Sequence, residues 1–169
     1  REGYPQMPHV FYMPDIPYRT FYPNEYLPWM KSLEEATDII QQELQTLLAQ
    51  NAKRFTPYVH SGLDRTVSDD GDLLDNESWT SAYLWQNGAP DTDVMACCPE
   101  TVKLMESLPL TKINGLAPSV LFSKLSAGAT IAPHNGMLNA RLICHLPLIV
   151  PPECGLRVGQ DEQQVNRGE

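Results

Sequence analysis

The chain has 169 residues and a mass of 19.0 kDa, a length that predicts a single domain with one compact core. Twelve Lys and Arg against 21 Asp and Glu give a formal net charge of −9, which disfavours binding to nucleic acids and to anionic membrane surfaces. The composition, 42% hydrophobic and 20% charged, without an apolar run of about 18 residues, predicts a soluble folded domain with no membrane span.

Residues 1–30 are expected to form an extended arm. Tyr and Trp alternate with Pro throughout this segment, and the prolines recur too often for a helix. Residues 32–48 then carry apolar side chains at helical spacing, with Ser32 and Glu35 placed as a capping box. A helix is therefore expected from about Ser32 to Leu48.

The middle of the chain alternates between polar loops and short regular elements. A polar stretch between residues 53 and 76 is interpreted as a solvated loop, and its aspartates are Asp69, Asp70, Asp72 and Asp75. Residues 79–85 alternate as in a strand, and residues 87–90 form a turn signal. Pro99, followed by apolar residues at helical spacing, predicts a short amphipathic helix.

The last third of the chain, residues 119–169, consists of short β-rich runs separated by Gly, Pro and Asn. These runs are 119–126, 130–133, 140–150 and 155–165. The pattern predicts antiparallel strands of a β-sandwich or jelly roll. The expected fold class is mainly β with flanking helices, with the 32–48 helix packed outside the jelly roll.

The cysteines lack the paired spacing of zinc sites, and the chain is long enough to fold without disulfides. They are Cys97, Cys98, Cys144 and Cys154. Free thiols in a reducing compartment are favoured, with a cytoplasmic location, although a disulfide involving the adjacent Cys97 and Cys98 stays open as an alternative.

Two of the four histidines, His134 and His145, lie in the β-rich part. If residues 140–150 form a strand, Arg141 and His145 share one face; buried between two sheets, an inward cation needs an anion such as a small carboxylate ligand. Alternatively, Arg141 pairs with a carboxylate of the protein and His145 donates to a backbone carbonyl. A non-haem iron site commonly uses His-x-Asp or His-x-Glu, but Gly136 follows His134 at that spacing.

The motif around these histidines is long and specific. Ser123 is followed by Pro-His-x-Gly-x-x-Asn-x-Arg-Leu-x-x-His-Leu, which begins at Pro133, and by a Pro-Pro-Glu-Cys-Gly run that begins at Pro151. This arrangement resembles the aspartyl/asparaginyl β-hydroxylase family, from about Trp79 to the end and more weakly before it. The resemblance implies a double-stranded β-helix (jelly roll, cupin-like). It also implies an oxygenase dependent on Fe(II), 2-oxoglutarate and O₂, with iron held by two histidines and no carboxylate.

By position, the resemblance implies roles for five residues. His134 matches the first iron ligand, and Ser123, eleven residues before it, matches a residue that hydrogen-bonds the cosubstrate. Arg141 and His145 match residues that line the 2-oxoglutarate pocket. Trp79 resembles an aromatic residue at the substrate mouth, while a core position is an equal alternative for a large aromatic side chain. His134, Ser123, Arg141 and His145 are expected to converge on one pocket.

Two departures from the family pattern are apparent. Ile143 stands where animal relatives carry a second arginine. In the family, a strand with the second iron histidine, and then an arginine for the far carboxylate of 2-oxoglutarate, would follow Glu169, and neither His9 nor His60 lies in a comparable context. The 169 residues given are therefore expected to supply only about half of the metal site and to catalyse the reaction poorly on their own.

The implied activity is hydroxylation of the β-carbon of aspartyl or asparaginyl residues or of a related substrate. The expected partner is a peptide, a protein or a small acidic substrate. Two alternatives stay open: hydroxylation of an acyl chain of lipid A, and a noncatalytic jelly-roll binding module. Fold alone does not choose between them.

Overall fold

The computed structural model describes residues 7–8, 10–58 and 76–169. Two of the histidines, His9 and His60, and the predicted aspartate loop (Asp69, Asp70, Asp72 and Asp75) lie outside the described residues. The elements, in chain order, are η1 (Asn24–Tyr26), α1 (Met30–Glu35), α2 (Thr37–Asn51), η2 (Ala52–Arg54), β1 (Thr56–Pro57), β2 (Trp79–Gln86), β3 (Ala89–Pro90), α3 (Thr92–Cys97), α4 (Pro99–Ser107), β4 (Val120–Leu125), β5 (Gly155–Val158) and β6 (Asp161–Gln164).

The chain forms two compact units. Unit 1 comprises Arg1–Asp38 and Asn135–Glu169, and unit 2 comprises Ile39–His134. The described elements are a mixture of helices and antiparallel sheets, and neither sheet closes on itself; the double-stranded β-helix stays a prediction. Among the described residues, no helix has the length and apolar character needed to cross a membrane.

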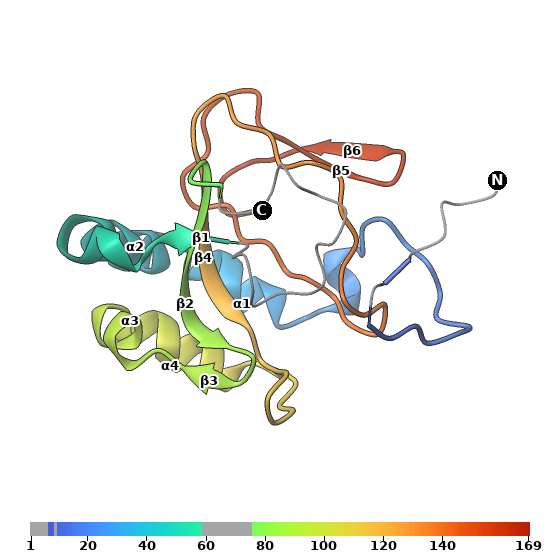
Figure 1. The fold of residues 1–169 in the computed structure, drawn as a ribbon, viewed down its shortest axis with the longest axis horizontal. Helices are drawn as coiled ribbons and strands as arrows, with labels where there is room; N and C mark the ends of the chain where they lie inside the picture. The colour runs from blue at the N-terminus through green and yellow to red at the C-terminus, as the bar shows by residue number, and fades with distance from the viewer. Residues whose placement is uncertain (1–6, 9, 59–75) are drawn as a thin grey trace. The chain divides into compact units, whose positions relative to one another are not determined.

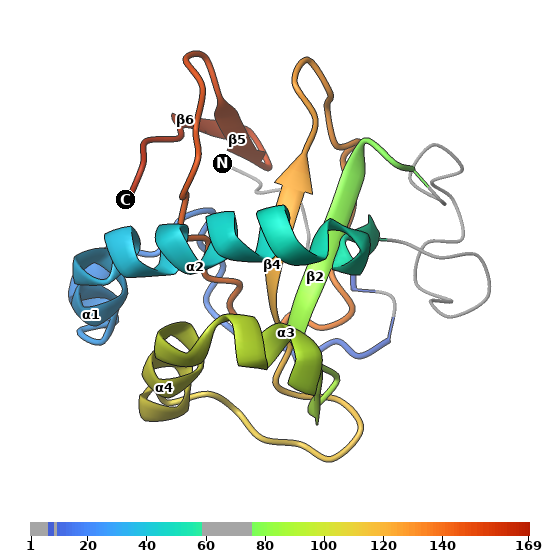
Figure 2. The ribbon, with the colours of Figure 1, turned by 90° about the vertical axis from the view of Figure 1, so that its left-hand side faces the viewer.

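A four-stranded antiparallel sheet organises unit 2 (Figure 1). Strand β2 pairs with β4 along one edge and with the short strands β1 and β3 along the other. Helices α2 and α3 lie across one face of β2 and β4 (Figure 2). The buried apolar residues of this unit come from these helices, from α4 and from the two long strands: Ile40, Leu44, Leu47, Trp79, Ala82, Leu84, Val94, Cys98, Met105 and Phe122.

A buried carboxylate joins two helices of this core. Glu43 of α2 is 8% exposed and accepts hydrogen bonds from the backbone N–H groups of Glu100 and Thr101, each over 2.8 Å. It also accepts one from the Thr101 hydroxyl over 2.6 Å. These are the unpaired donors of the first turn of α4, so a side chain from another helix caps this terminus.

The helical stretch expected at 32–48 is divided in the structure. Helices α1 and α2 are separated at Ala36, which has φ −90° and ψ 3°. The hydroxyl of Thr37 donates to the carbonyl of Glu34 over 2.7 Å, which gives a partner to a carbonyl near the break. Ser32 lies inside α1. The N-cap residue of α1 is Trp29, and its side chain makes no capping hydrogen bond. The predicted capping box is therefore wrong.

The strand, the turn and the helix predicted for the middle of the chain are confirmed, whereas residues 59–75 of the predicted polar loop lie outside the described residues. The strand expected at 79–85 is β2, and it turns into β3 through Asn87 and Gly88, which have φ of 52° and 85°. Two successive residues with positive φ between paired strands form the hairpin turn that matches the twist of a sheet. Pro99 is the first residue of α4, where its missing N–H has no helical partner to lose.

In the β-rich part, some of the predicted strands form and others do not. The 119–126 run contains β4, and the 155–165 run forms the β5–β6 hairpin. The runs 130–133 and 140–150 contain no strand, so those predictions are wrong. Pro133 ends the first of these runs and Pro147 interrupts the second, and a proline cannot donate to a ladder of strand hydrogen bonds.

In unit 1, polar contacts tether the N-terminal arm. The side chain of Asn139 accepts from the backbone N–H of Met13 and donates to the carbonyl of the same residue, each over 2.7 Å. The Thr20 hydroxyl donates to Asp161 of β6 over 2.6 Å. The described part of the arm is thus attached to the C-terminal residues of the chain, as the run of blue beside orange in Figure 1 also shows.

Candidate functional site

Strands β2 and β4 bring Trp79 and Ser123 together. Trp79 stands opposite Leu125, and Ser81 stands opposite Ser123. Residues directly opposite in an antiparallel pair, and those two along the strand, project from the same face. The indole Nε1–H of Trp79 donates to Ser123 Oγ over 3.0 Å. Ser123 is exposed, whereas Trp79 is 6% exposed.

Aromatic contacts surround the Trp79 indole. Its ring stacks on that of Tyr58, with the centroids 4.1 Å apart and the planes inclined by 18°. The side chains of Ile131 and Ala132 pack against it, and its centroid lies 5.6 Å from that of His134, with the rings tilted by 43°. Trp79 therefore combines a buried position with direct contact to two predicted site residues.

The orientation of His134 is set by its own loop. His134 Nδ1 lies 2.9 Å from the carbonyl oxygen of Ala132. Because a carbonyl only accepts, this contact places the proton on Nδ1 and leaves the lone pair on Nε2. The side chain is exposed. A histidine that ligates a metal through one nitrogen commonly donates from the other to a backbone carbonyl in this way.

His134 would provide one ligand to a metal ion, and few other side chains that could ligate a metal lie near it. Gly136 supplies no carboxylate at the spacing of the usual iron motif. Within the described ranges, no group of three or more His, Cys, Asp and Glu side chains is placed to hold a metal ion. His134 therefore fits the role of a single iron ligand, and the complete ligand set stays a prediction.

Arg141 and His145 belong to unit 1, so their convergence with His134 and Ser123 stays a prediction. Both side chains are exposed, and the segment that carries them is not a strand. Arg141 and His145 therefore do not share the buried face of a strand, and that prediction is wrong. Desolvation lowers the pKa of His145 from its usual value, which favours the neutral imidazole.

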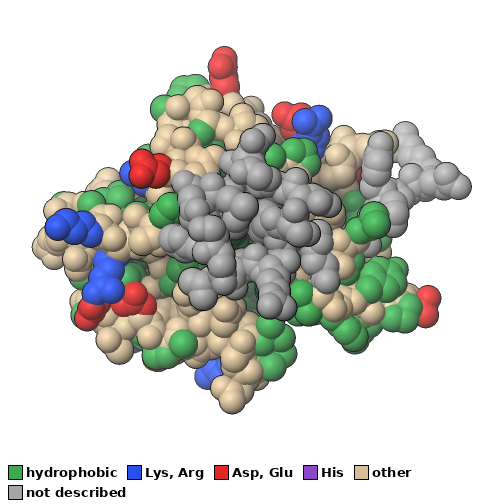
Figure 3. All heavy atoms as spheres, in the orientation of Figure 1, with side chains coloured by type: hydrophobic (Ala, Val, Ile, Leu, Met, Phe, Trp, Pro, Cys, Tyr) green, Lys and Arg blue, Asp and Glu red, His purple; other side chains and the backbone are tan. Residues whose placement is uncertain are grey.

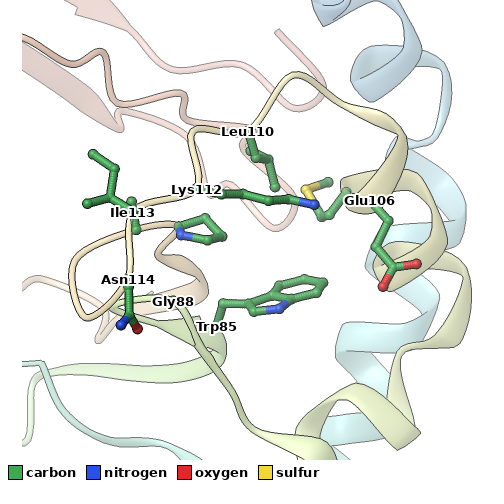
Figure 4. Close-up of a pocket in the computed structure, with 10 residues that line it drawn as sticks. Trp85, Gly88, Glu106, Leu110, Lys112, Ile113 and Asn114 are labelled. Carbon is green, nitrogen blue, oxygen red and sulfur yellow. The ribbon is translucent and has the colours of Figure 1, made fainter.

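Two cavities lie elsewhere in unit 2. The first, of about 370 Å³, is lined by Trp85, Glu106, Lys112 and neighbouring residues; Figure 4 shows the Lys112 side chain lying between Leu110 and the Trp85 indole. The second, of about 520 Å³, is lined by residues from η2, from β1, β2 and β3 and from the start of α3. Trp79, Ser123 and His134 line neither cavity; Ser123 and His134 are exposed, whereas Trp79 is buried.

Opposite charges meet at the second cavity. Arg54 is 3.5 Å from Asp91 and also pairs with Asp93, and Figure 3 shows basic and acidic side chains side by side between α2 and α3. These pairs neutralise the guanidinium. They are half-exposed, and such pairs contribute about 0 to 1 kcal/mol, so we assign them to local structure.

Two features of the site were missed by sequence reasoning. Tyr58, which stacks on Trp79, lies at the start of the stretch that was interpreted as a solvated loop, and its aromatic side chain is the one sequence signal that could have marked it as packed. The carbonyl of Ala132, which orients His134, carries no signal in the sequence because every residue has a carbonyl. Both depend on how the chain is folded around β2.

Comparisons with known proteins identify relatives that match most of the chain, including the candidate site. The model of the family described as aspartyl/asparaginyl beta-hydroxylase matches residues 34–169. The aspartate beta-hydroxylase domain-containing protein 2 of Xenopus tropicalis is 25% identical over 158 residues, which are 94% of this chain and 40% of that protein. Its Homo sapiens counterpart is 26% identical over the same length, with 41% of its own length covered.

A second kind of relative is the aspartyl/asparaginyl beta-hydroxylase of Homo sapiens, which is 26% identical over 144 residues. These are 85% of this chain and 17% of that protein. The chain thus spans less than half the length of these relatives. The family match covers most of the chain and includes Ser123, His134, Arg141 and His145, and we conclude that the chain belongs to the aspartyl/asparaginyl beta-hydroxylase family.

Proposed function

We propose that the protein is an Fe(II)- and 2-oxoglutarate-dependent dioxygenase that hydroxylates the β-carbon of an aspartyl or asparaginyl residue, or a closely related substrate. The observation that carries the proposal is the orientation of His134, whose Nδ1–H is held by Ala132 and whose Nε2 is available to a metal. Family membership supports the hydroxylase class. The substrate is proposed to be a peptide, a protein or a small acidic molecule.

The bound groups would supply oxidising chemistry: with Fe(II) present, O₂ oxidises 2-oxoglutarate to succinate and CO₂, and one oxygen atom enters a C–H bond of the substrate. The residues of this chain have binding and orienting tasks. His134 is proposed to ligate iron through Nε2. Ser123, Arg141 and His145 are proposed to bind the carboxylates of 2-oxoglutarate, since hydrogen bonds to a charged acceptor are the stronger kind.

The test is succinate formation from 2-oxoglutarate by the intact protein, with Fe(II), ascorbate, O₂ and peptides containing Asp or Asn. His134→Ala is expected to lower turnover by more than about 100-fold, because loss of even an outer partner of a metal ligand costs about 10- to 100-fold. Lys124→Ala, next to Ser123 on β4 but facing the opposite side of the sheet, is the control and should leave turnover unchanged.

Equal turnover by wild type and His134→Ala would eliminate the metal assignment. Absence of turnover and of 2-oxoglutarate binding in the wild type would favour the noncatalytic binding module. Hydroxylation of lipid A acyl chains, without hydroxylation of any Asp or Asn peptide, would replace the proposed substrate while leaving the metal site in place.

A further inference from the structure

The first cavity of unit 2, which we call the Trp85 pocket, lies away from the candidate site. Its volume is about 370 Å³, within the range of about 300 to 1,000 Å³ that is common for ligand pockets. Its lining comes from β2, the turn after β2, α4 and the loop that leads to β4. Trp79 and Trp85 lie near opposite ends of β2, and the rise of a strand places them about 20 Å apart. A small molecule in this pocket would therefore be remote from the residues proposed to bind iron.

Backbone contacts hold the walls of the Trp85 pocket in place. The N–H of Gly88 donates to the carbonyl of Pro118 over 2.8 Å, and Ile113 and Ala117 exchange two backbone hydrogen bonds over 3.1 and 2.8 Å. A Cβ on Gly88 would lie 2.8 Å from the Ala117 carbonyl oxygen, so the turn and the loop are in direct contact. Because the walls are already tied together, binding of a ligand costs little ordering of the protein.

Apolar side chains line much of the pocket. The Trp85 indole is half-buried, and Met105 is 8% exposed. Leu110, Ile113 and Pro118 extend this surface, and Ile113 is 48% exposed. An aromatic or branched aliphatic group of a ligand would remove this surface from water, and a second ring would also stack on the indole.

A lysine without an ion pair lies across this apolar surface. Figure 4 shows the Lys112 side chain running between Leu110 and the Trp85 indole. Its stem covers hydrophobic surface while its ammonium stays charged, as is common for long basic side chains. In the part of the chain that the structure describes, no carboxylate forms an ion pair with this ammonium, not even that of Glu106 in the same lining. A ligand carboxylate would supply the charged acceptor that the ammonium lacks.

We propose that the Trp85 pocket binds an apolar group that carries a carboxylate. The apolar group packs against Trp85, Met105 and Ile113, and the carboxylate accepts hydrogen bonds from the Lys112 ammonium. Two sources share this chemistry: a free hydrophobic amino acid and the C-terminal residue of a peptide. They differ at the α-nitrogen, which is a charged ammonium in the amino acid and a neutral amide in the peptide, and Glu106 lines the pocket as the possible partner of an ammonium.

This inference is independent of the proposed function. No residue that is proposed to bind iron or 2-oxoglutarate lines the Trp85 pocket. Binding at the pocket is therefore measurable without a metal ion, 2-oxoglutarate or turnover.

The first test compares two ligands that differ in one group. N-acetyl-L-phenylalanine carries a ring and a carboxylate, whereas N-acetyl-L-phenylalaninamide carries the same ring and a neutral amide. Binding to the intact protein is followed through the indole N–H signal of Trp85 in the ¹H–¹⁵N spectrum, which is identified by its absence in Trp85→Phe. The acid should bind with a dissociation constant of about 0.1 to 1 mM, as expected for a ligand of this size. The amide should bind about 5- to 10-fold more weakly, because it lacks the charged acceptor.

The second test removes the charge from the protein. In Lys112→Met, the acid should bind about 5- to 10-fold more weakly, and its advantage over the amide should disappear, because both changes remove the same interaction. Lys112→Arg keeps the charge and should retain the preference for the acid. Lys112 is exposed, so both variants should fold, and thermal unfolding of each variant checks this.

The matched control is Lys103→Met. Lys103 is an exposed lysine of α4 whose ammonium lies 3.9 Å from the Glu100 carboxylate, and it does not line the Trp85 pocket. The dissociation constants of the acid and of the amide should not change in this variant.

Three results would overturn the proposal: a Trp85 signal that does not move with the acid at up to about 10 mM, equal binding of acid and amide, or a preference for the acid that survives in Lys112→Met. Movement of the Trp79 signal in place of the Trp85 signal would overturn it as well. If the preference for the acid depends on Lys112, the proposal stands, and L-phenylalanine identifies the source. Tighter binding than that of the N-acetyl acid indicates a free amino acid, and weaker binding indicates the C-terminus of a peptide.

Discussion

Replacing Glu43 of α2 should remove the hydrogen bonds that cap the N-terminus of α4 and so lower the stability of the protein. The Glu43 carboxylate accepts three hydrogen bonds, two from backbone N–H groups and one from the Thr101 hydroxyl, at 2.6 to 2.8 Å. In Glu43→Ala, the buried Thr101 loses two partners, and an unsatisfied buried polar group costs about 1 to 3 kcal/mol. Loss of a negative charge at a helix N-terminus costs about 0.3 to 2 kcal/mol more. Because the three bonds share one carboxylate, their contributions are not additive, and we expect a total loss of about 3 kcal/mol of unfolding free energy.

Glu43→Gln retains one acceptor oxygen but turns an amide N–H₂ towards the donors of α4, so it should lose about 2 kcal/mol. The assay is urea unfolding followed by tryptophan fluorescence, with the midpoint shifted and the slope unchanged. Glu106→Gln, which changes an exposed carboxylate of α4, is the control and should change stability by less than about 0.5 kcal/mol. A loss below about 1 kcal/mol in Glu43→Ala would refute the capping role.

The remaining predictions concern a thiol and a turn. Burial, with repulsion from Glu43 and Cys97, raises the pKa of Cys98 from 9.0 to about 12, so a disulfide reagent should modify Cys98 more slowly than the other cysteines. Because the unfolded thiol ionises first, Cys98 should favour unfolding as pH rises from 9 towards 12, and the stability advantage of the wild type over Cys98→Ala should shrink there, as measured by urea unfolding. Gly88→Ala should lower stability by about 1 to 3 kcal/mol, by thermal unfolding, because φ is +85° and the added Cβ would lie 2.8 Å from the Ala117 carbonyl oxygen. Gly115→Ala, with φ +72° and open space around it, should cost less, and equal losses would contradict the steric part.

Local patterns in the sequence were sufficient for several elements. Apolar spacing predicted helix in the region of α1 and α2, alternation predicted β2 and β4, and Pro99 marked the start of α4. The Asn87–Gly88 pair predicted a turn because few residues tolerate positive φ. Each of these signals acts between residues a few positions apart, where backbone sterics and one apolar face decide the conformation.

Local patterns failed where a strand needs a partner. Residues 140–150 have β-rich composition, yet they form no strand, because strand formation depends on pairing and burial more than on intrinsic preference. The break at Ala36 was also missed. Its neighbours retain helical spacing, but the backbone there leaves the helical region, and nothing in the local pattern marks the position.

For the candidate site, the sequence determined the types of residue, and the resemblance supplied their roles. It did not determine which groups touch. Tertiary structure decided that Trp79 donates to Ser123, 44 positions away, that Tyr58 stacks on the same indole and that Glu43 caps a helix 57 positions further on. The physical reason is that the register of β2 against β4 and the packing of α2 over the sheet bring distant residues within hydrogen-bonding distance, and such contacts leave no periodic trace in the chain.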